Sequence, residues 1–342
     1  YSFLRLRPVS IINDALAPVF EINGEHFYIS SSVGITEIDE SVDEVFDAFK
    51  HAELAMYEAK SRGRNRYCFY SPQMQAKILE RVNLETAMRK ALIKDEFLLY
   101  YQPQFDDLGV LRGVEALIRW HHPDKGIISP MQFIPLAEDS KLIIPIGEWV
   151  VREACNTLAR WRDDPLLNQV KVSVNVSVIQ FAQDDFVDLV RLILVETGVD
   201  AKLLQFELTE SMLIDDKANI LAKMQGLKAL GVLLSLDDFG TGYSSLSYLQ
   251  QLPFDQLKID QSFVRNLNGQ GDQHPLALTI TTMGHSLGLE VIAEGIEEKE
   301  SLLKLQSFGC NLFQGYFMGH PMPLSKLEEV ALQQLSLMQT DS

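Results

Sequence analysis

The chain has 342 residues, 46% hydrophobic and 23% charged, and its 30 Lys and Arg residues face 47 Asp and Glu residues for a formal charge of −17. This composition is typical of a folded protein of about two domains and excludes a largely disordered chain. The acidic excess opposes binding to nucleic-acid backbones or anionic membranes, so we expect no DNA, RNA or membrane contact from this segment. An anionic ligand would need its own local source of positive charge.

The cysteines Cys68, Cys155 and Cys310 lie far apart, without a C-x-x-C pair. They indicate neither a disulfide framework nor a thiolate metal site, and they fit a reducing, cytoplasmic compartment. No apolar run approaches the roughly 18 residues that a membrane span needs. Because the sequence opens at Tyr1 without Met, we interpret it as a fragment whose upstream part could carry a sensory region or a membrane anchor.

The first part of the chain predicts an incomplete domain. Residues 9–35 alternate like strands, and residues 42–61 space their apolar side chains like a helix that ends at Gly63. About 70 residues are few for an independent α/β domain, so residues 1–70 are interpreted as a portion of one. Residues 71–94 repeat apolar side chains at helical spacing and predict a connecting helix. A coiled-coil dimer contact is the alternative interpretation of the same repeat.

Residues 95–342 predict an α/β fold, because short strand-like runs are separated by helical stretches. Eight runs over about 250 residues match a (β/α)8 TIM-like barrel. The runs are 97–102, 113–120, 170–177, 203–208, 232–236, 256–259, 290–293 and 311–316. An open doubly wound sheet is the alternative, but it would need a Gly-rich turn after the first strand, where Pro103–Asp106 stands.

Polar residues occur at or near the carboxyl end of each run. In a barrel these ends meet on one face, where the active sites of such enzymes lie. A helix cap or a solvated loop explains any single one, but eight in phase predict a ring of oxygen ligands. The residues are Gln102, Glu115 with Arg119, Asn175, Glu207 with Glu210, Asp237 with Asp238, Lys258 with Asp260, Glu294, and Gln314.

The carboxylates of this ring would repel one another unless cations neutralise them. They are Glu115, Glu207, Asp237, Asp238 and Glu294. Carboxylate and amide oxygens suit Mg²⁺ or Mn²⁺, whereas Zn²⁺ sites usually include His or Cys, which the ring lacks. The adjacent aspartates favour two cations, since one carboxylate can bridge them, and paired metals are typical of phosphoester hydrolysis.

Lys258 and the loop after Asp237 lie near the ring, and each has two possible interpretations. Lys258 is either a salt-bridge partner or the group that orients or deprotonates an attacking water. The segment from Asp238 to Ser245 contains Gly240 and Gly242 but lacks the ending of a P-loop. It therefore fits a flexible loop that affects the adjacent aspartates better than it fits a phosphate cradle.

Residues 84–335 resemble the EAL family of cyclic di-GMP phosphodiesterases, whose name-giving triplet stands here as Glu115-Ala116-Leu117. The other motifs that carry the resemblance are Tyr101-Gln102-Pro103, Phe133–Glu138, Val174–Ser177, Glu207–Ser211, Asp237–Gly242, Leu257–Asp260, Ala293–Glu297 and Gln314-Gly315-Tyr316. Small departures at Gln104-Phe105 and Gly319-His320 fall outside the metal set. The resemblance implies a bacterial signalling enzyme that hydrolyses cyclic di-GMP to linear pGpG with two Mg²⁺ or Mn²⁺ ions.

The resemblance also implies roles for single residues. It assigns Glu115, Asn175, Glu207 and Asp237 to the first metal, and Asp237, Asp238 and Glu294 to the second. Lys258 would contact the catalytic water, completing a catalytic set with Glu115, Asp237, Asp238 and Glu294. Substrate contacts would come from Gln102, Leu117 against a guanine, Arg119 toward phosphate, Asn175, Asp260, Glu297 and Gln314. Glu210 would brace the loop after Asp238.

Residues 1–70 resemble the C-terminal half of a GGDEF, diguanylate-cyclase-like domain, on Ser32–Ile35, Ala52–Lys60 and Arg62–Tyr67. The GGDEF signature itself is not in the sequence, so we expect no synthesis of cyclic di-GMP. Because related domains are often dimeric, the resemblance implies a homodimer through the barrel domain. The alternative function is a cyclic di-GMP sensor without catalysis, although degenerate relatives lose acidic residues that are all present here.

Overall fold

The computed structural model describes residues 11, 15–16, 18–38, 45–213, 216–240, 249–265, 267 and 274–340. The chain divides into two compact units, Tyr1–Ala87 and Met88–Ser342. Within the residues described, we find no helix with the length and apolar character needed to cross a membrane.

The first unit pairs two sets of short strands. Strands β1 (Phe20–Ile22) and β2 (Glu25–Phe27) form an antiparallel hairpin, and β3 (Ser32–Ile35) runs parallel to β4 (Arg66–Phe69). Helix α2 (Val45–Ser61) packs against β3 and β4. The contact is so close that a Cβ on Gly34 would lie 1.8 Å from the carbonyl oxygen of Ala52, which only glycine avoids. Helix α3 (Pro72–Ala91) follows β4 and crosses the division between the units.

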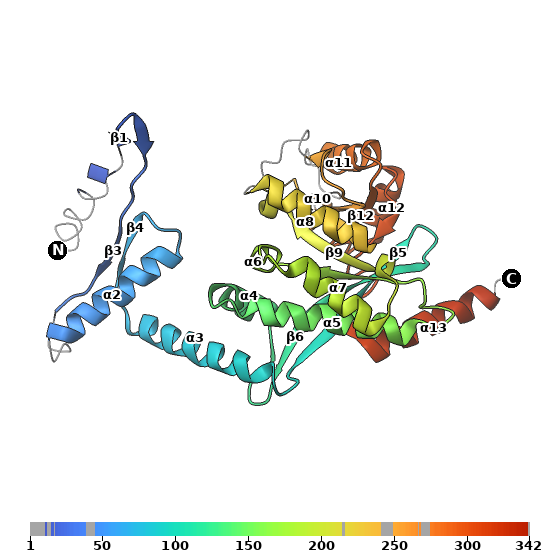
Figure 1. The fold of residues 1–342 in the computed structure, drawn as a ribbon, viewed down its shortest axis with the longest axis horizontal. Coiled ribbons are helices and arrows are strands. Elements are labelled where there is room, and N and C mark those ends of the chain that lie inside the picture. Colours follow the sequence, from blue (N-terminus) through green and yellow to red (C-terminus); the bar gives the residue numbers. More distant parts are fainter. Residues whose placement is uncertain are drawn as a thin grey trace. The chain divides into compact units, whose positions relative to one another are not determined.

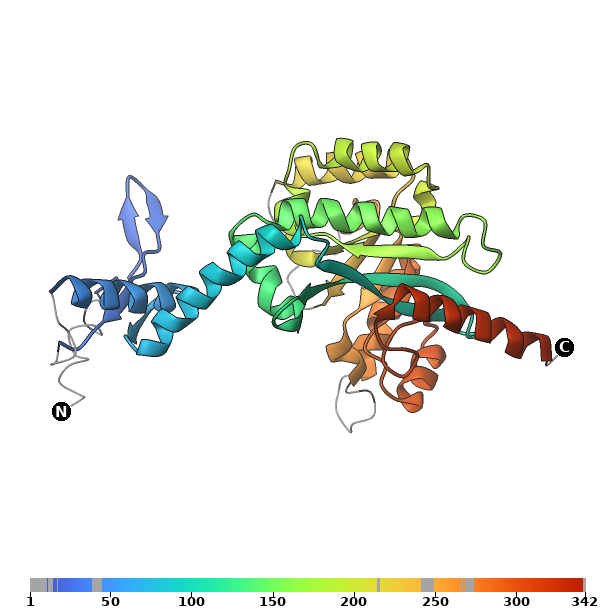
Figure 2. The same ribbon diagram turned by 90° about the horizontal axis from the view of Figure 1, so that it is seen from below.

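The second unit contains a closed barrel of eight strands, shown with its surrounding helices in Figures 1 and 2. Each strand-like run predicted from the sequence is a barrel strand, so the predicted barrel is confirmed. In order around the barrel they are β5 (Phe97–Asp106), β6 (Leu111–His122), β8 (Lys171–Asn175), β9 (Leu204–Thr209), β10 (Leu233–Phe239), β11 (Gln256–Ile259), β12 (Glu290–Ala293) and β13 (Leu312–Phe313). Two short strands extend the sheet, β7 (Gly126–Ile128) beside β6 and β14 (Met322–Pro323) beside β5.

The helices of this unit cover the outside of the barrel (Figures 1 and 2), and α5, α8 and α11 contact strands β8, β10 and β11. They are α4 (Pro130–Asp139), α5 (Ile143–Trp161), α6 (Val178–Phe181), α7 (Phe186–Thr197), α8 (Lys217–Leu230), α10 (Gln261–Arg265), α11 (His274–Ser286), α12 (Lys299–Ser307) and α13 (Leu324–Thr340), with the 3-10 turns η1 (Ala201–Leu203) and η2 (Glu210–Leu213).

The first barrel strand departs from regular β/α alternation. Strand β5 is antiparallel to both of its barrel neighbours, β6 and β13, whereas the other neighbouring pairs are parallel. A four-residue turn joins β5 to β6 in place of a helix, because Asp106 accepts hydrogen bonds from the backbone nitrogens of Leu108 and Val110 and Gly109 takes a φ of 76°. The carboxyl end of β5 therefore lies beside the amino end of β13, on the face opposite the other strand ends.

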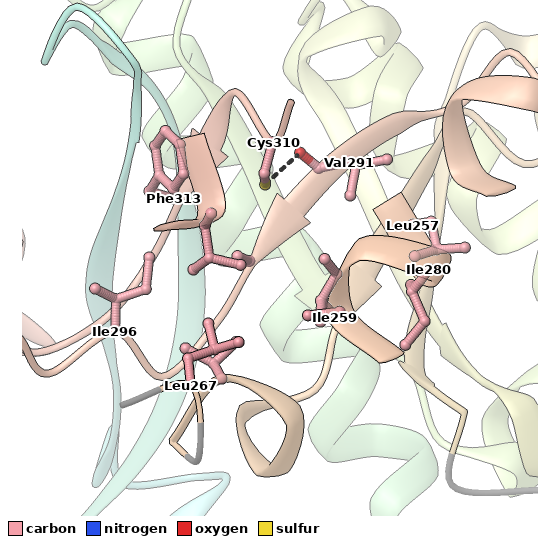
Figure 3. Packing of buried hydrophobic residues seen from close by; sticks show 12 residues of the cluster. Leu257, Ile259, Leu267, Ile280, Val291, Ile296, Cys310 and Phe313 are labelled. Atoms are coloured by element: carbon pink, nitrogen blue, oxygen red, sulfur yellow. Dashed lines mark hydrogen bonds between the residues drawn. The ribbon is translucent and has the colours of Figure 1, made fainter. Parts of the chain in front are cut away.

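An apolar cluster packs strands β11 to β13 against helices α10 to α12, as Figure 3 shows. A Cβ on Gly284 of α11 would lie 2.5 Å from a methyl of Val291, so the helix approaches β12 closely. Within the cluster the Cys310 thiol lies 3.3 Å from the carbonyl oxygen of Leu312, and burial raises the pKa of Cys310 to about 12. The thiol is therefore a buried packing group, which agrees with the absence of a sequence signal for a disulfide or thiolate site.

Candidate active site

The predicted ring residues come from consecutive barrel strands. Successive side chains on a strand point to opposite faces, so Glu207 faces the barrel interior while its neighbours Phe206 and Leu208 face the surrounding helices. All three side chains are buried. The same alternation applies to Lys258 on β11 between the buried Leu257 and Ile259. The barrel therefore gathers Glu115 from β6, Asn175 from β8, Glu207 from β9, Asp237 from β10, Lys258 from β11 and Glu294 from the end of β12.

The ammonium of Lys258 lies among four carboxylates, here called the acid cluster: Glu115, Glu207, Asp237 and Glu294. Its Nζ is 2.5 Å from an oxygen of Glu207 and 2.5 Å from one of Glu294. The carboxylates of Asp237 and Glu115 are 3.4 and 3.8 Å away. Since the Lys258 side chain is 1% exposed, these ion pairs are shielded from water and strong.

One lysine does not balance this acid cluster. Burial, together with repulsion from Glu115, raises the pKa of Glu207 well above its ordinary value, although Lys258 opposes the shift. Burial likewise raises the pKa of Glu294 to about 8, with Lys258 opposing and Asp237 adding to the rise. The pKa of Lys258 lies well above its ordinary value, because the four carboxylates outweigh the effect of burial. The cluster thus favours additional positive charge.

Glu115 differs from Glu207 and Glu294, because its pKa is lowered. Two amide groups donate hydrogen bonds to its carboxylate and stabilise the charged form. Asn175 donates to one carboxylate oxygen at 2.6 Å, and Gln314 donates to the other at 2.5 Å. Burial raises the pKa of Glu115, but Lys258 and these two hydrogen bonds outweigh it, so the net shift is downward. Gln102 lies directly opposite Glu115 in the β5–β6 register and accepts a hydrogen bond from Gln314 at 3.1 Å. The antiparallel strand therefore still delivers Gln102 to the site, through its middle rather than its end.

The donor set fits hard divalent cations. Over the described part of the chain, no three acidic, His or Cys side chains stand at metal-binding separations, and Lys258 lies between the Glu207 and Glu294 carboxylates. Oxygen Oε1 of Glu207 is nevertheless buried without a hydrogen-bond partner, which is a costly state for a carboxylate oxygen. The four carboxylates and Asp238 outnumber the single ammonium, and all donors are oxygens of the kind that Mg²⁺ and Mn²⁺ bind.

Asp238 follows Asp237 in an irregular part of β10. The register shifts between Leu236 and Phe239, and Asp238 adopts a φ of 55°, a conformation that costs energy for a residue other than glycine. Its backbone nitrogen donates to the Asp237 carboxylate at 2.9 Å. Burial and Asp237 raise the pKa of Asp238, although the residue is exposed to solvent. The irregularity places two consecutive aspartates at the same end of β10.

The remaining predicted residues have other contacts in this structure. Asp260 accepts a hydrogen bond from the backbone nitrogen of Ser262 at 2.9 Å, at the start of α10. Glu297 forms an exposed ion pair with Arg265 at 3.2 Å. Glu210 is buried at the start of η2, whereas residues 241–245 of the loop it was predicted to brace lie outside the described residues.

A cleft of about 520 Å³ is lined by two predicted substrate contacts, Leu117 and Arg119. Asn175 lines the same cleft, whose wall is otherwise mostly apolar side chains of α4, α5 and α6. The guanidinium of Arg119 lies 5.5 Å from the centre of the Tyr100 ring and donates to the carbonyl of Ile118. The cleft reaches the acid cluster through Asn175, which donates to Glu115, whereas the cluster's carboxylates and Lys258 are not among its lining residues.

Sequence reasoning missed Gln104, which is 4% exposed and donates to Gln314 at 2.8 Å. The spacing of Gln102 and Gln104 carried the signal, because residues two apart on a strand face the same side.

Fold and site together define an α/β-barrel protein with an acidic centre at the carboxyl ends of its strands. The family model described as the EAL domain matches residues 85–321, and the chain belongs to that family.

Relatives support this assignment along most of the chain. The bifunctional diguanylate cyclase/cyclic di-GMP phosphodiesterase MucR of Pseudomonas aeruginosa is 40% identical over 309 residues, and cyclic di-GMP phosphodiesterase PdeR of Escherichia coli is 38% identical over 309. Each match covers 90% of this chain but only 45% and 46% of the relative, so the chain spans less than half of either.

Solved structures show the same fold. A PaMucR phosphodiesterase in complex with c-di-GMP is 41% identical, with a TM-score of 0.69, over 72% of this chain and 99% of that one. The EAL enzyme Bd1971 in its cAMP- and cyclic-di-GMP-bound form is 30% identical, with a TM-score of 0.72, over 85% of this chain and 77% of that one.

Proposed function

We propose that the chain is a phosphodiesterase that hydrolyses cyclic di-GMP to linear pGpG and so acts in second-messenger signalling. The observation that carries the proposal is the complete acid cluster around Lys258, next to a cleft that contains Arg119. The c-di-GMP complex of the PaMucR phosphodiesterase and the name of PdeR support the choice of substrate.

The proposed reaction adds water to one phosphodiester. The water oxygen bonds to phosphorus, one phosphorus–oxygen bond to ribose breaks, and the leaving oxygen gains a proton. Arg119 attracts a phosphate and Leu117 packs against a guanine in the adjacent cleft. Lys258, fixed by Glu207 and Glu294, orients the attacking water.

Two divalent cations, Mg²⁺ or Mn²⁺, are part of the proposal. Glu115, Asn175, Glu207 and Asp237 would hold one, and Asp237, Asp238 and Glu294 the other. Bound there, the cations would lower the pKa of a water toward neutrality and neutralise the excess carboxylates. They would also supply the local positive charge that an anionic substrate needs in order to bind to a protein of formal charge −17.

The proposal for the other parts of the chain concerns their domain organisation. Residues 1–70 derive from a GGDEF-like domain, residues 71–94 connect it, residues 95–342 form the barrel domain, and Glu210 braces the loop after Asp238. The match to the bifunctional MucR, which covers more of this chain than the EAL match does, supports the first of these. We also propose a homodimer through the barrel domain, which light scattering of the purified chain would test.

Product analysis tests the function directly. The purified chain is incubated with cyclic di-GMP and Mg²⁺ or Mn²⁺, and products are resolved by chromatography. Glu115→Ala should lose roughly 10²–10⁴-fold in turnover, the range for removing a group that acts in the transition state. Glu290→Ala is the matched control, because Glu290 begins β12 and pairs with Lys171 instead of Lys258. Retention of cyclic di-GMP without pGpG under either metal would favour the sensor alternative.

A further inference from the structure

Three buried glutamines form a hydrogen-bonded chain that ends on Glu115. Gln102 and Gln104 come from β5, and Gln314 follows β13; they are 8%, 4% and 4% exposed. Gln104 Nε2 donates to Gln314 Oε1 at 2.8 Å, and Gln314 Nε2 donates to Glu115 Oε2 at 2.5 Å and to Gln102 Oε1 at 3.1 Å. The path from Gln104 through Gln314 to the Glu115 carboxylate therefore runs in one direction, and Gln102 accepts a side bond from Gln314.

The direction matters because a carboxamide presents a donor on one side and an acceptor on the other in nearly the same shape. Packing alone does not distinguish the two orientations of Gln314. Gln102 takes the Gln314 nitrogen, and the bond from Gln104 occupies the Gln314 oxygen, which leaves the Gln314 nitrogen turned toward Glu115. In the reversed orientation the amide oxygen would face the Glu115 carboxylate, which is repulsive and unsatisfied in a buried site.

The backbone fixes Gln104 in this place. Gln104 lies opposite Gly113 in the antiparallel register of β5 and β6. A Cβ on Gly113 would lie 2.6 Å from the Gln104 side-chain oxygen, so only glycine leaves room for this amide position. The same antiparallel strand places Gln102 two residues away on the interior face, where it accepts from Gln314.

We propose that Gln104 is a positioning residue: its amide sets the orientation of Gln314, which then holds the Glu115 carboxylate in place for the reaction. The kinetic part of this inference rests on the proposed function, whereas the orientation of Gln314 is measurable without substrate. Gln104 touches neither substrate nor water in this scheme and acts only through Gln314.

A double-mutant cycle tests whether Gln104 acts through Gln314. Gln104→Met should lower kcat about 10-fold with KM within about twofold, because losing an oriented hydrogen bond to a charged group costs roughly that factor. In a Gln314→Met background, Gln104→Met should change kcat less than about twofold. Gln205→Met is the matched control, because this 1% exposed glutamine bonds to Ser173 and Gln256, and its kcat should stay within about twofold of the unsubstituted chain. The proposal would be overturned if the kcat losses of Gln104→Met and Gln314→Met multiplied in the double variant. It would also be overturned if Gln104→Met changed KM alone.

A second readout needs no catalysis. In the ¹⁵N-labelled protein without metal or substrate, the side-chain amide signal of Gln314 is identified by its loss in Gln314→Met. This signal should move in Gln104→Met and stay in Gln205→Met; an unmoved signal in Gln104→Met refutes the orienting role. If the signal moves but the unsubstituted chain makes no pGpG, the orientation stands and the proposed function alone fails.

If Gln104→Met does not fold, Gln104→Glu replaces it with nearly the same shape. A carboxylate at this position accepts from Gln314 Nε2 and so turns the Gln314 oxygen toward Glu115. The kcat should then fall more than about 10-fold, and further than in Gln205→Glu, which adds the same charge to the barrel interior elsewhere. Equal losses in these two variants would contradict the proposal.

Discussion

Two adjacent layers inside the barrel contrast in charge. The acid cluster with Asn175 and Lys258 forms one, and a glutamine layer two residues earlier on the same strands forms the other: Ser173, Gln205, Ser235 and Gln256. In the glutamine layer, Gln205 donates to Ser173 and Gln256, and Ser235 donates to Gln256. The side chains of this layer are neutral, although Gln256 also donates to the Glu290 carboxylate, whereas the acid cluster holds four carboxylates around one ammonium.

This difference in charge indicates that the glutamine layer contributes to the stability of the fold and the acid cluster to the reaction. Hydrogen-bonded buried amides and hydroxyls help to specify a unique core, although the Oε1 atom of Gln205 has no hydrogen-bond partner. Carboxylates held with raised pKa values, as at Glu207 and Glu294, are costly unless cations complete them. We therefore expect substitutions in the glutamine layer to change stability, and substitutions in the acid cluster to change turnover and cation response.

The largest expected effect comes from Lys258→Met. Turnover of cyclic di-GMP should fall roughly 10²–10⁴-fold, because the group that orients the water is lost and four carboxylates lose their shared ion pair. Lys171→Met is the control, since Lys171 pairs with Glu290 at the amino end of its strand in a partly exposed position. Product chromatography with Mn²⁺ measures both variants, and similar losses in the two would contradict a specific role for Lys258 in the acid cluster.

The second effect concerns cations and stability. At a cation concentration about 100 times its Kd, binding stabilises the native chain by about 2.7 kcal/mol, or roughly 5–10 °C in unfolding temperature. Glu207→Gln should lose most of this shift, whereas Glu290→Gln should keep it, because only Glu207 belongs to the acid cluster. Thermal unfolding in EDTA and in Mn²⁺ gives the comparison. An unsubstituted chain that unfolds at one temperature in both solutions would refute the need for cations.

The third effect is confined to the glutamine layer. Gln256→Met leaves the donors of Gln205 and Ser235 without their acceptor, so the free energy of unfolding should fall by about 1–3 kcal/mol. Both kcat and KM should stay within about twofold. Gln169→Met, at an exposed glutamine, should leave stability unchanged. Chemical denaturation measures the loss, and a turnover defect in Gln256→Met would show that the layers are not separable.

Much of this architecture could be predicted from the sequence, and the exceptions have physical causes. Apolar runs of strand length mark every barrel strand, but they carry no direction, so the antiparallel β5 was not foreseen. Its signal was the turn chemistry of Asp106 and Gly109, which favours a hairpin over a crossover helix.

The site was easier to predict at its acidic members than at its amides. Glu207 and Lys258 interrupt or end apolar runs, so their charge stands out against buried neighbours. Gln104 and Gln205 are neutral, and a polar residue within a strand is usually expected to face solvent. Their partners come from strands distant in the sequence, which no local pattern reports.

The smallest expected effect lies outside both layers, at Arg119 in the cleft. Arg119→Lys keeps the charge but loses the planar fork that binds phosphate in two places, so KM should rise about fivefold with kcat within about twofold. Arg112→Lys, at the other end of β6 where Arg112 pairs with Asp106, should change neither. A loss in kcat at constant KM would instead place Arg119 in the chemical step. The measurement thus decides whether substrate binding in the cleft and chemistry at the acid cluster are energetically distinct, although Glu115 and Arg119 stand four residues apart on one strand.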